Sequence, residues 1–249
     1  MGDGFELSGV VHLVRPLHLR ARDLEELHQG VSAAPPSSLF YHVVQGDLRA
    51  PAGDDPPLDD FSAWMNGVVQ DGEVAERLSY AIQSAGGPPE SLRQAVLETI
   101  AKLPEAARRA RAAPPGGEFQ FLTVDSVTTP TGSVAADSDE LMDQLAGSES
   151  SVWFYHFIER PWFDPGEPEP VRWLRARGEE RIADWLAEAV RPARPVGAMR
   201  RRVLERWRRR TMRRRIAAAT MLTEGERAEA GREAVAGLVR RLHQGDQPS

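Results

Sequence analysis

Two histidines have the residue type and the surroundings that could carry chemistry. His42 lies in SSLFYHVV and His156 lies in SSVWFYHFIE, 114 residues further along the chain. Acidic residues follow each of them, namely Asp47, Asp54 and Asp55 after the first and Glu159 and Asp164 after the second. An imidazole beside carboxylates can bind a metal ion or move a proton. One hypothesis is therefore a metal-dependent or acid/base enzyme that uses His42, His156 and these carboxylates.

The opposing interpretation is that both histidines are hydrogen-bonded residues at the edge of a core. The sequence has no helical His-x-x-x-His pair, calcium-binding loop, phosphate-binding glycine loop, nucleophile elbow or dinucleotide fingerprint. It has no cysteine, which excludes disulfides, thiolate zinc sites and a cysteine nucleophile. We therefore expect no catalytic residue, metal ligand or cofactor. A non-enzymatic interaction or regulatory module is favoured over the enzyme.

The two histidine segments belong to a longer internal repeat. Asp23, Glu26 and Leu27 precede His42 at the same distances at which Asp137, Glu140 and Leu141 precede His156. Three further pairs follow in the same order: tryptophans in DFSAWM and PVRWL, then EVAERLSYA with RIADWLAEA, then SLRQAVLETI with AMRRRVLERW. The preserved order indicates that one unit of roughly 100 residues was duplicated.

The elements of each unit follow from hydrophobic spacing and breaker residues. We expect strands over residues 10–20, 38–44, 119–124 and 151–158, which are rich in aromatic, β-branched or alternating apolar residues. Helices are expected over residues 22–31, 64–69 (capped by Asp60), 73–83 and 137–145, with others from about 91, 170, 179, 197 and 223. A helix between two strands favours a parallel pair. The predicted fold class is α+β: two tandem βαβ-plus-helices repeats with pseudo-twofold symmetry, mostly helical, plus an extra C-terminal helix.

These elements divide the chain into five segments. The first repeat spans residues 1–103, an Ala-, Arg-, Pro- and Gly-rich linker spans 104–118, and the second repeat spans 119–222. An appended helix over 223–243 and a tail over 244–249 follow. No stretch approaches the ~18 consecutive apolar residues of a membrane span, and the N-terminus has acidic residues where a signal peptide needs basic ones. We expect a cytoplasmic protein without a membrane span.

Charge is strongly partitioned along the chain. Residues 191–215 contain 12 arginines and one acid, Glu205, whereas the remainder has 19 basic and 36 acidic residues, a formal charge of −17. Apolar residues at four-residue spacing predict a helix with arginines on its other faces. This helix could bind a polyanion or pair with the protein's own acidic surface. The candidate binding residues are Arg200, Arg201, Arg202, Arg206, Arg208, Arg209, Arg210, Arg213, Arg214 and Arg215.

A second candidate surface is a groove between the two repeats. Its candidate residues are Tyr41, His42, Tyr155, His156 and Trp162. Along a strand, each tyrosine would point away from the histidine that follows it. The expected partner is another protein, with nucleic acid or a different polyanion as the alternative.

The order of motifs resembles an uncharacterised bacterial family of duplicated domains that has no assigned function. The likeness is closest at SSLFYH, DFSAW, EVAERL and ESLRQAVLETI, and it covers most of residues 10–210. The second half departs from the pattern, because PVRWL lacks the Asp-Phe pair and its last helix is far more basic. The resemblance implies the two-repeat architecture and carries no reaction or ligand with it.

Overall fold

The computed structural model describes residues 4–46, 59–190 and 195–221, with side chains as far as residue 213. The described chain is mostly helical and has one two-stranded antiparallel sheet, so its class is α+β. It divides into two compact units, Met1–Val203 and Leu204–Ser249. The boundary falls inside the long helix α13 (Val196–Met221).

The sheet is a ribbon of two 17-residue strands, β1 (Phe5–Ala21) and β2 (Phe119–Ala135). Phe5 pairs with Ala135 at one end and Ala21 pairs with Phe119 at the other. The pairing register shifts between Glu6 and Ser8 and between Pro16 and Arg20. At each shift, three residues of one strand lie opposite a single residue of its partner, which makes a special β-bulge.

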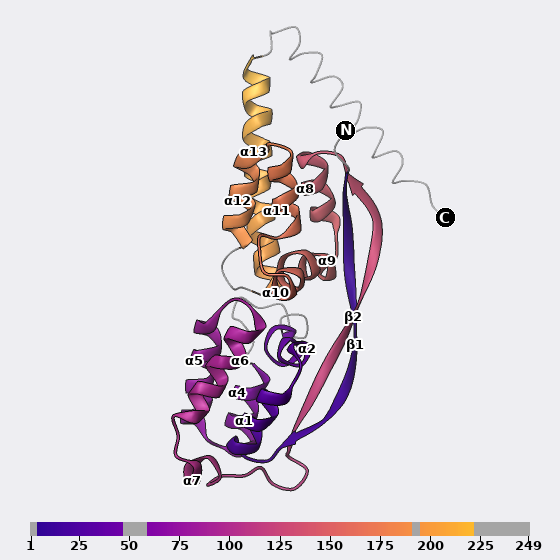
Figure 1. Ribbon diagram of the computed structural model, residues 1–249. Helices are drawn as coiled ribbons and strands as arrows, with labels where there is room; N and C mark the ends of the chain where they lie inside the picture. The colour runs from indigo at the N-terminus through magenta and orange to yellow at the C-terminus, as the bar shows by residue number, and fades with distance from the viewer. Residues whose placement is uncertain (1–3, 47–58, 191–194, 222–249) are drawn as a thin grey trace, which may run out of the picture. The chain divides into compact units, whose positions relative to one another are not determined.

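Two groups of helices pack along this ribbon (Figure 1). The first group comprises α1 (Leu24–Ala33), α2 (Pro36–Leu39), the π-helix η1 (Phe40–Val44), α4 (Asp60–Trp64), the π-helix η2 (Met65–Val69), α5 (Gly72–Ala85), α6 (Pro89–Ala101) and α7 (Glu105–Arg108). The second comprises α8 (Ser138–Gly147), α9 (Ser150–Phe154), the π-helix η3 (Tyr155–Glu159), α10 (Arg160–Phe163), α11 (Glu169–Ala176), α12 (Glu180–Val190) and the first part of α13.

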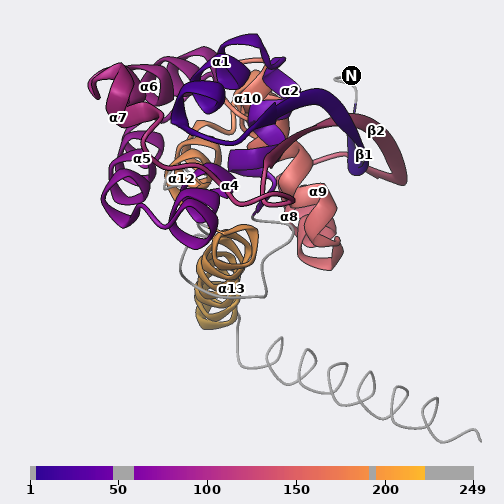
Figure 2. The same ribbon diagram turned by 90° about the horizontal axis from the view of Figure 1, so that it is seen from below.

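Each strand packs against both helical groups. β1 begins beside the second group, where the Phe5 ring lies 5.7 Å from the Trp173 ring, and ends in the first core, where Ala21 is fully buried. β2 runs in the opposite direction, since Phe119 and Phe121 belong to the first core while its far end contacts α8. In both views α8 and α9 lie beside the ribbon (Figure 2).

The strands predicted over residues 38–44 and 151–158 are wrong, because both segments are helical. Each begins with a short α-helix and continues as a π-helix, in which backbone hydrogen bonds join residues five apart instead of four. Phe40, Tyr41 and His42 are all buried, so the alternation that a half-exposed strand requires is absent. An apolar run of this length does not distinguish a buried strand from a buried helix, and here tertiary packing overrides the β preference of its residues.

The predicted parallel βαβ units are wrong for the same reason, since each half contributes one strand and the two strands pair antiparallel. The helix cap is also displaced by one residue. Asp59, rather than Asp60, caps α4 by accepting a hydrogen bond from the Ser62 N–H at 2.8 Å. The other predicted helices occur at the expected places, and α13 extends to Met221. The helix predicted over residues 223–243 lies outside the described residues.

Gly30 marks the tightest contact between β2 and the first group of helices. A Cβ atom at this position of α1 would overlap the ring of Phe121, which is fully buried. Gly147, in the last turn of α8, has nothing within 4 Å of the place its Cβ would take. The two glycines therefore form a matched pair that differs in the space available.

Gly30→Ala is expected to lower the free energy of unfolding by about 1–3 kcal/mol through overpacking. Gly147→Ala is expected to leave it unchanged or to raise it slightly, because alanine is the better helix former. Urea unfolding followed by circular dichroism measures both. Equal effects of the two substitutions would contradict the close packing of Phe121 on α1.

Candidate functional site

His42 links the first group of helices to β2. Its side chain is 3% exposed, and its Nε2 accepts a hydrogen bond from the backbone N–H of Leu122 at 2.9 Å. An acceptor at Nε2 places the proton of the neutral ring on Nδ1, which donates to Asp60 Oδ2 at 2.9 Å. The ring also packs on Phe119, with 4.8 Å between centroids. The cap at Asp59 thus leaves the next carboxylate available for the histidine.

His156 makes the corresponding link between the second group of helices and β1. Its Nε2 accepts from the backbone N–H of Ser8 at 3.1 Å, and its Nδ1 lies 3.1 Å from Glu169 Oε2. Arg160 donates to the other oxygen of Glu169 at 3.0 Å. Burial lowers the pKa of His156, although the neighbouring Glu169 acts in the opposite direction. The ring is therefore neutral at pH 7.

The two histidine sites use equivalent residues. Ser8 and Leu122 are separated by 114 residues, the same interval that separates His42 from His156. Asp60 and Glu169 each lie in the first turn of a short helix and precede by four residues a tryptophan, Trp64 or Trp173. In each site both ring nitrogens are held by hydrogen bonds, so the histidine joins a strand to a carboxylate and has the geometry of a structural bridge.

The other predicted groove residues lie at the same junctions. Tyr41 is buried, and its ring meets the His42 ring edge-on at 5.0 Å. Tyr155 is half-buried and packs against His156 in the same way. Trp162 of α10 is half-buried against the first core and lies 5.9 Å from the Phe40 ring. These side chains pack inward. Three of the carboxylates proposed to act with the histidines, Asp47, Asp54 and Asp55, lie outside the described residues.

A buried hydrogen bond between a histidine and a carboxylate, which sequence reasoning missed, joins β1 to η3. His12 Nε2 and Glu159 Oε2 are 2.7 Å apart, and the two side chains are 7% and 4% exposed. The His12 ring makes edge contacts with Phe40 and Phe154, one from each helical group. A charged residue within the apolar run FIE was the available signal. In the described parts of the chain, no group of three or more histidines and carboxylates could hold a metal ion.

The basic helix α13 carries the predicted arginines in several different environments. In the first unit, Arg200 donates to the backbone oxygen of Ala146 at 3.0 Å, and Arg202 is half-buried. In the second unit, Arg208, Arg209 and Arg213 are exposed, and none of them forms an ion pair within the described chain. Arg201, Arg206 and Arg210 have interaction partners. The side chains of Arg214 and Arg215 lie outside the described part.

Comparison with known proteins gives a family and one structural likeness. A family model described as "Family of unknown function (DUF5752)" matches residues 2–206. The solved structure of OrfY from Thermoproteus tenax is similar, with a TM-score of 0.67 and 25% sequence identity over 82% of this chain and 97% of that one. No protein with a curated description matches the chain. No helix within the described residues is long and apolar enough to cross a membrane.

The neutral state of His156 predicts a pH dependence of stability. Because burial holds the pKa of the folded-state ring below the ordinary 6.5, the unfolded chain binds a proton that the folded chain does not. Stability is therefore lost as pH falls through about 6.5, with a slope of at most about 1.4 kcal/mol per pH unit. Urea unfolding of wild type and His156→Asn at pH 7.5 and 5.5 measures this.

The loss of stability on acidification is expected to be smaller in His156→Asn than in wild type. His18→Asn removes an exposed histidine of β1 and is the control for the substitution itself. Parallel pH dependence in wild type and His156→Asn would show that the ring is not held neutral in the folded state.

Proposed function

We propose that this chain, which belongs to the DUF5752 family of unknown function, is a non-enzymatic binding module that holds a polyanionic partner through helix α13. The observation that carries the proposal is the set of exposed arginines in the second unit. Arg208, Arg209 and Arg213 have no acidic partner within the described chain. Phosphate groups are the common polyanionic ligands for such side chains, since guanidinium groups donate to them in a planar fork.

The spacing of the arginines supports a ligand outside the chain. Arg209 and Arg213 are four residues apart, so they lie along one face of the helix. Like charges at this interval destabilise a helix by about 0.2–0.5 kcal/mol per pair. Three exposed arginines of the first unit, Arg15, Arg77 and Arg109, each pair with a carboxylate instead. Arg209 and Arg213 form no ion pair within the described residues, so an added anion would relieve their mutual repulsion.

The histidine sites support the non-enzymatic part of the proposal. His42 and His156 have both ring nitrogens engaged, with the backbone of a strand on one side and a carboxylate on the other. A general base needs a nitrogen within reach of a substrate proton, and these rings are 3% exposed or less. The first unit is accordingly proposed as a scaffold for binding.

Tandem duplication with pseudo-twofold symmetry is part of this proposal. It is supported by the 114-residue interval that relates the strands, the histidines and the strand N–H groups they bind. The first-half counterpart of α13 is SLRQAVLETI, which has a single arginine. We infer that the basic face was added to the repeat in the second half. A partner protein at the junction of the repeats and a cytoplasmic location remain expectations of the same proposal.

The proposal predicts salt-dependent binding of polyanions that depends on three arginines. Full-length wild type and Arg208→Gln/Arg209→Gln/Arg213→Gln are titrated into a short fluorescein-labelled single-stranded DNA at several salt concentrations, and anisotropy is recorded. Wild type is expected to bind, with an affinity that falls steeply as salt rises. The triple variant is expected to bind more weakly, with a salt slope lower by about two to three. Glutamine is used because it keeps helix propensity.

A matched control removes the same charge from paired arginines. Arg15→Gln/Arg77→Gln/Arg109→Gln changes three residues that are 59%, 53% and 52% exposed and that already have carboxylate partners. This variant is expected to keep most of the wild-type affinity and salt slope. Absence of binding to DNA, RNA and polyphosphate at low ionic strength would refute the proposal, as would equal losses in the two triple variants.

A further inference from the structure

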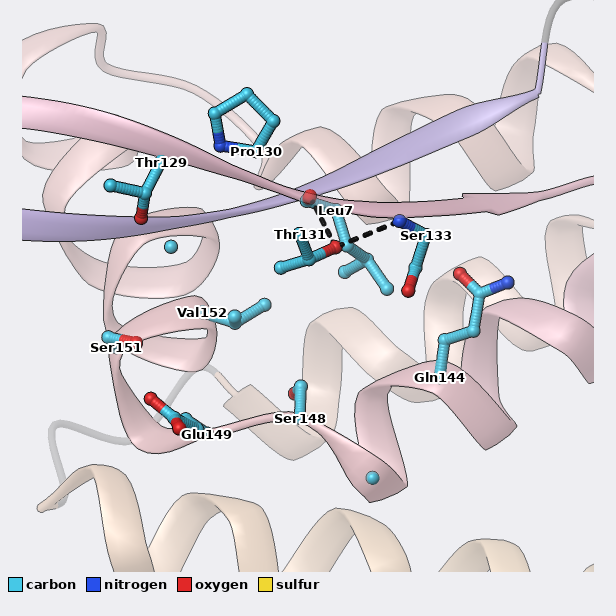
Figure 3. Close-up of a pocket in the computed structure, with 12 residues that line it drawn as sticks. Leu7, Thr129, Pro130, Thr131, Ser133, Gln144, Ser148, Glu149, Ser151 and Val152 are labelled. Carbon is cyan, nitrogen blue, oxygen red and sulfur yellow. Dashed lines mark hydrogen bonds between the residues drawn. The ribbon is translucent and has the colours of Figure 1, made fainter.

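A pocket of about 470 Å³ lies between the end of the β ribbon and the turn that joins α8 to α9. Thr129, Thr131 and Ser133 of β2 form one wall, and Ser148, Glu149 and Ser151 form the other (Figure 3). Leu7 and Val152 supply apolar surface between them. The volume is within the range of small-molecule sites. Nothing in the site described above uses this pocket.

The pocket walls are held in place by internal hydrogen bonds. Thr131 Oγ1 donates to the backbone oxygen of Leu7 at 2.8 Å and accepts from the Ser133 N–H at 3.1 Å, which fixes the bulge. Between them, Gly132 has a φ of +75°, a conformation that favours glycine. Ser148 Oγ donates to the Leu145 oxygen at 2.9 Å. The hollow is therefore bounded by residues with defined positions.

Several polar groups of the pocket are left without partners. Gln144 Nε2 donates to the Val134 oxygen at 3.1 Å, and this bond orients the amide so that its Oε1 is on the Ser133 side (Figure 3). Oε1 is buried and has no hydrogen-bond partner, which is costly for an amide oxygen. The carboxylate of Glu149 precedes α9 without capping it and forms no ion pair within the described residues.

The same place in the first half is filled. Positions 114 residues earlier replace Thr131 and Ser133 by Leu17 and Leu19, which pack against the first core. Phe121 occupies the position that corresponds to Leu7, and Gly30 occupies the position that corresponds to Gln144. The buried ring of Phe121 lies against Gly30. Thr123 occupies the position that corresponds to Gly9, and its hydroxyl oxygen lies 2.8 Å from the hydroxyl oxygen of Ser37. The second half thus has smaller or polar residues wherever the first half has the groups that fill this space.

We infer that this pocket binds a small organic cation, with one or more ammonium groups on a short alkyl chain. Glu149 is the one charged side chain among the described residues that line the pocket, and its carboxylate is an acceptor, whereas ammonium groups are donors only. No basic side chain and no aromatic ring lines the pocket, which disfavours an anion and a stacked ring. Leu7 and Val152 suit the alkyl part. The chain outside residues 191–215 has a formal charge of −17, which attracts cations.

Isothermal titration of the full-length protein with spermidine tests the inference. Wild type is expected to bind one spermidine saturably. Ser133→Leu restores the leucine of the first half, and by filling the pocket it is expected to weaken binding at least ten-fold. Glu149→Gln removes one carboxylate and is expected to weaken binding about five-fold. The unfolding midpoint of each variant reports whether it has folded.

Glu6→Gln is the matched control, because Glu6 is an exposed acid on β1 that lies beside Leu7 in sequence and does not line the pocket. It is expected to bind spermidine like wild type. The inference is overturned if wild type shows no saturable one-to-one binding, or if Glu149→Gln and Glu6→Gln weaken it equally. Triethylene glycol that binds as tightly as spermidine would also overturn it, because the ligand class would then be neutral.

Discussion

The backbone N–H groups of Ser8 and Leu122 depend on histidines that come from the opposite half of the sequence. A two-stranded ribbon is marginally stable without a packed face, so its cohesion with the helices decides whether the first unit holds together. Each histidine provides this cohesion by accepting from a strand on one side and facing a carboxylate on the other. The carboxylate favours the tautomer with its proton on Nδ1, which leaves Nε2 free to accept the hydrogen bond from the strand.

Around this shared arrangement the two halves differ in identifiable places. The buried pair His12 and Glu159 has Ser126 and Gln45 at the corresponding positions of the other half, and Gln45 keeps a buried amide oxygen without a partner. The bulge opposite Leu7 carries hydroxyls, whereas the bulge opposite Phe121 carries leucines. Helix α13 is strongly basic, whereas SLRQAVLETI, which occupies the corresponding position in the first half, has a single arginine. The polar and charged features that distinguish the halves thus occur both in the buried interior, at His12 and Glu159, and at the surface.

The sequence was sufficient to predict most helices, because their apolar spacing and caps are local properties. It was misleading at Phe40–Val44 and Tyr155–Glu159, where aromatic and β-branched residues form π-helices that are buried on most sides. The far half of β2 was missed since residues 125–130 are exposed and do not alternate in polarity. Histidine was recognised as important, but its partners on the strands are 80 and 148 residues away, and no local pattern indicates them.

The exchange of strands between the two helical groups has a consequence for biosynthesis. As the chain leaves the ribosome, the first group of helices emerges complete before Phe119 and Phe121, which belong to its core. At that stage β1 has no partner strand along either edge. The helices that pack on the beginning of β1 are synthesised last. The nascent N-terminal half therefore waits with unpaired backbone groups, a state prone to misassociation. Closure of the fold comes late because it joins distant parts of the polypeptide, and long-range pairing of this kind slows folding.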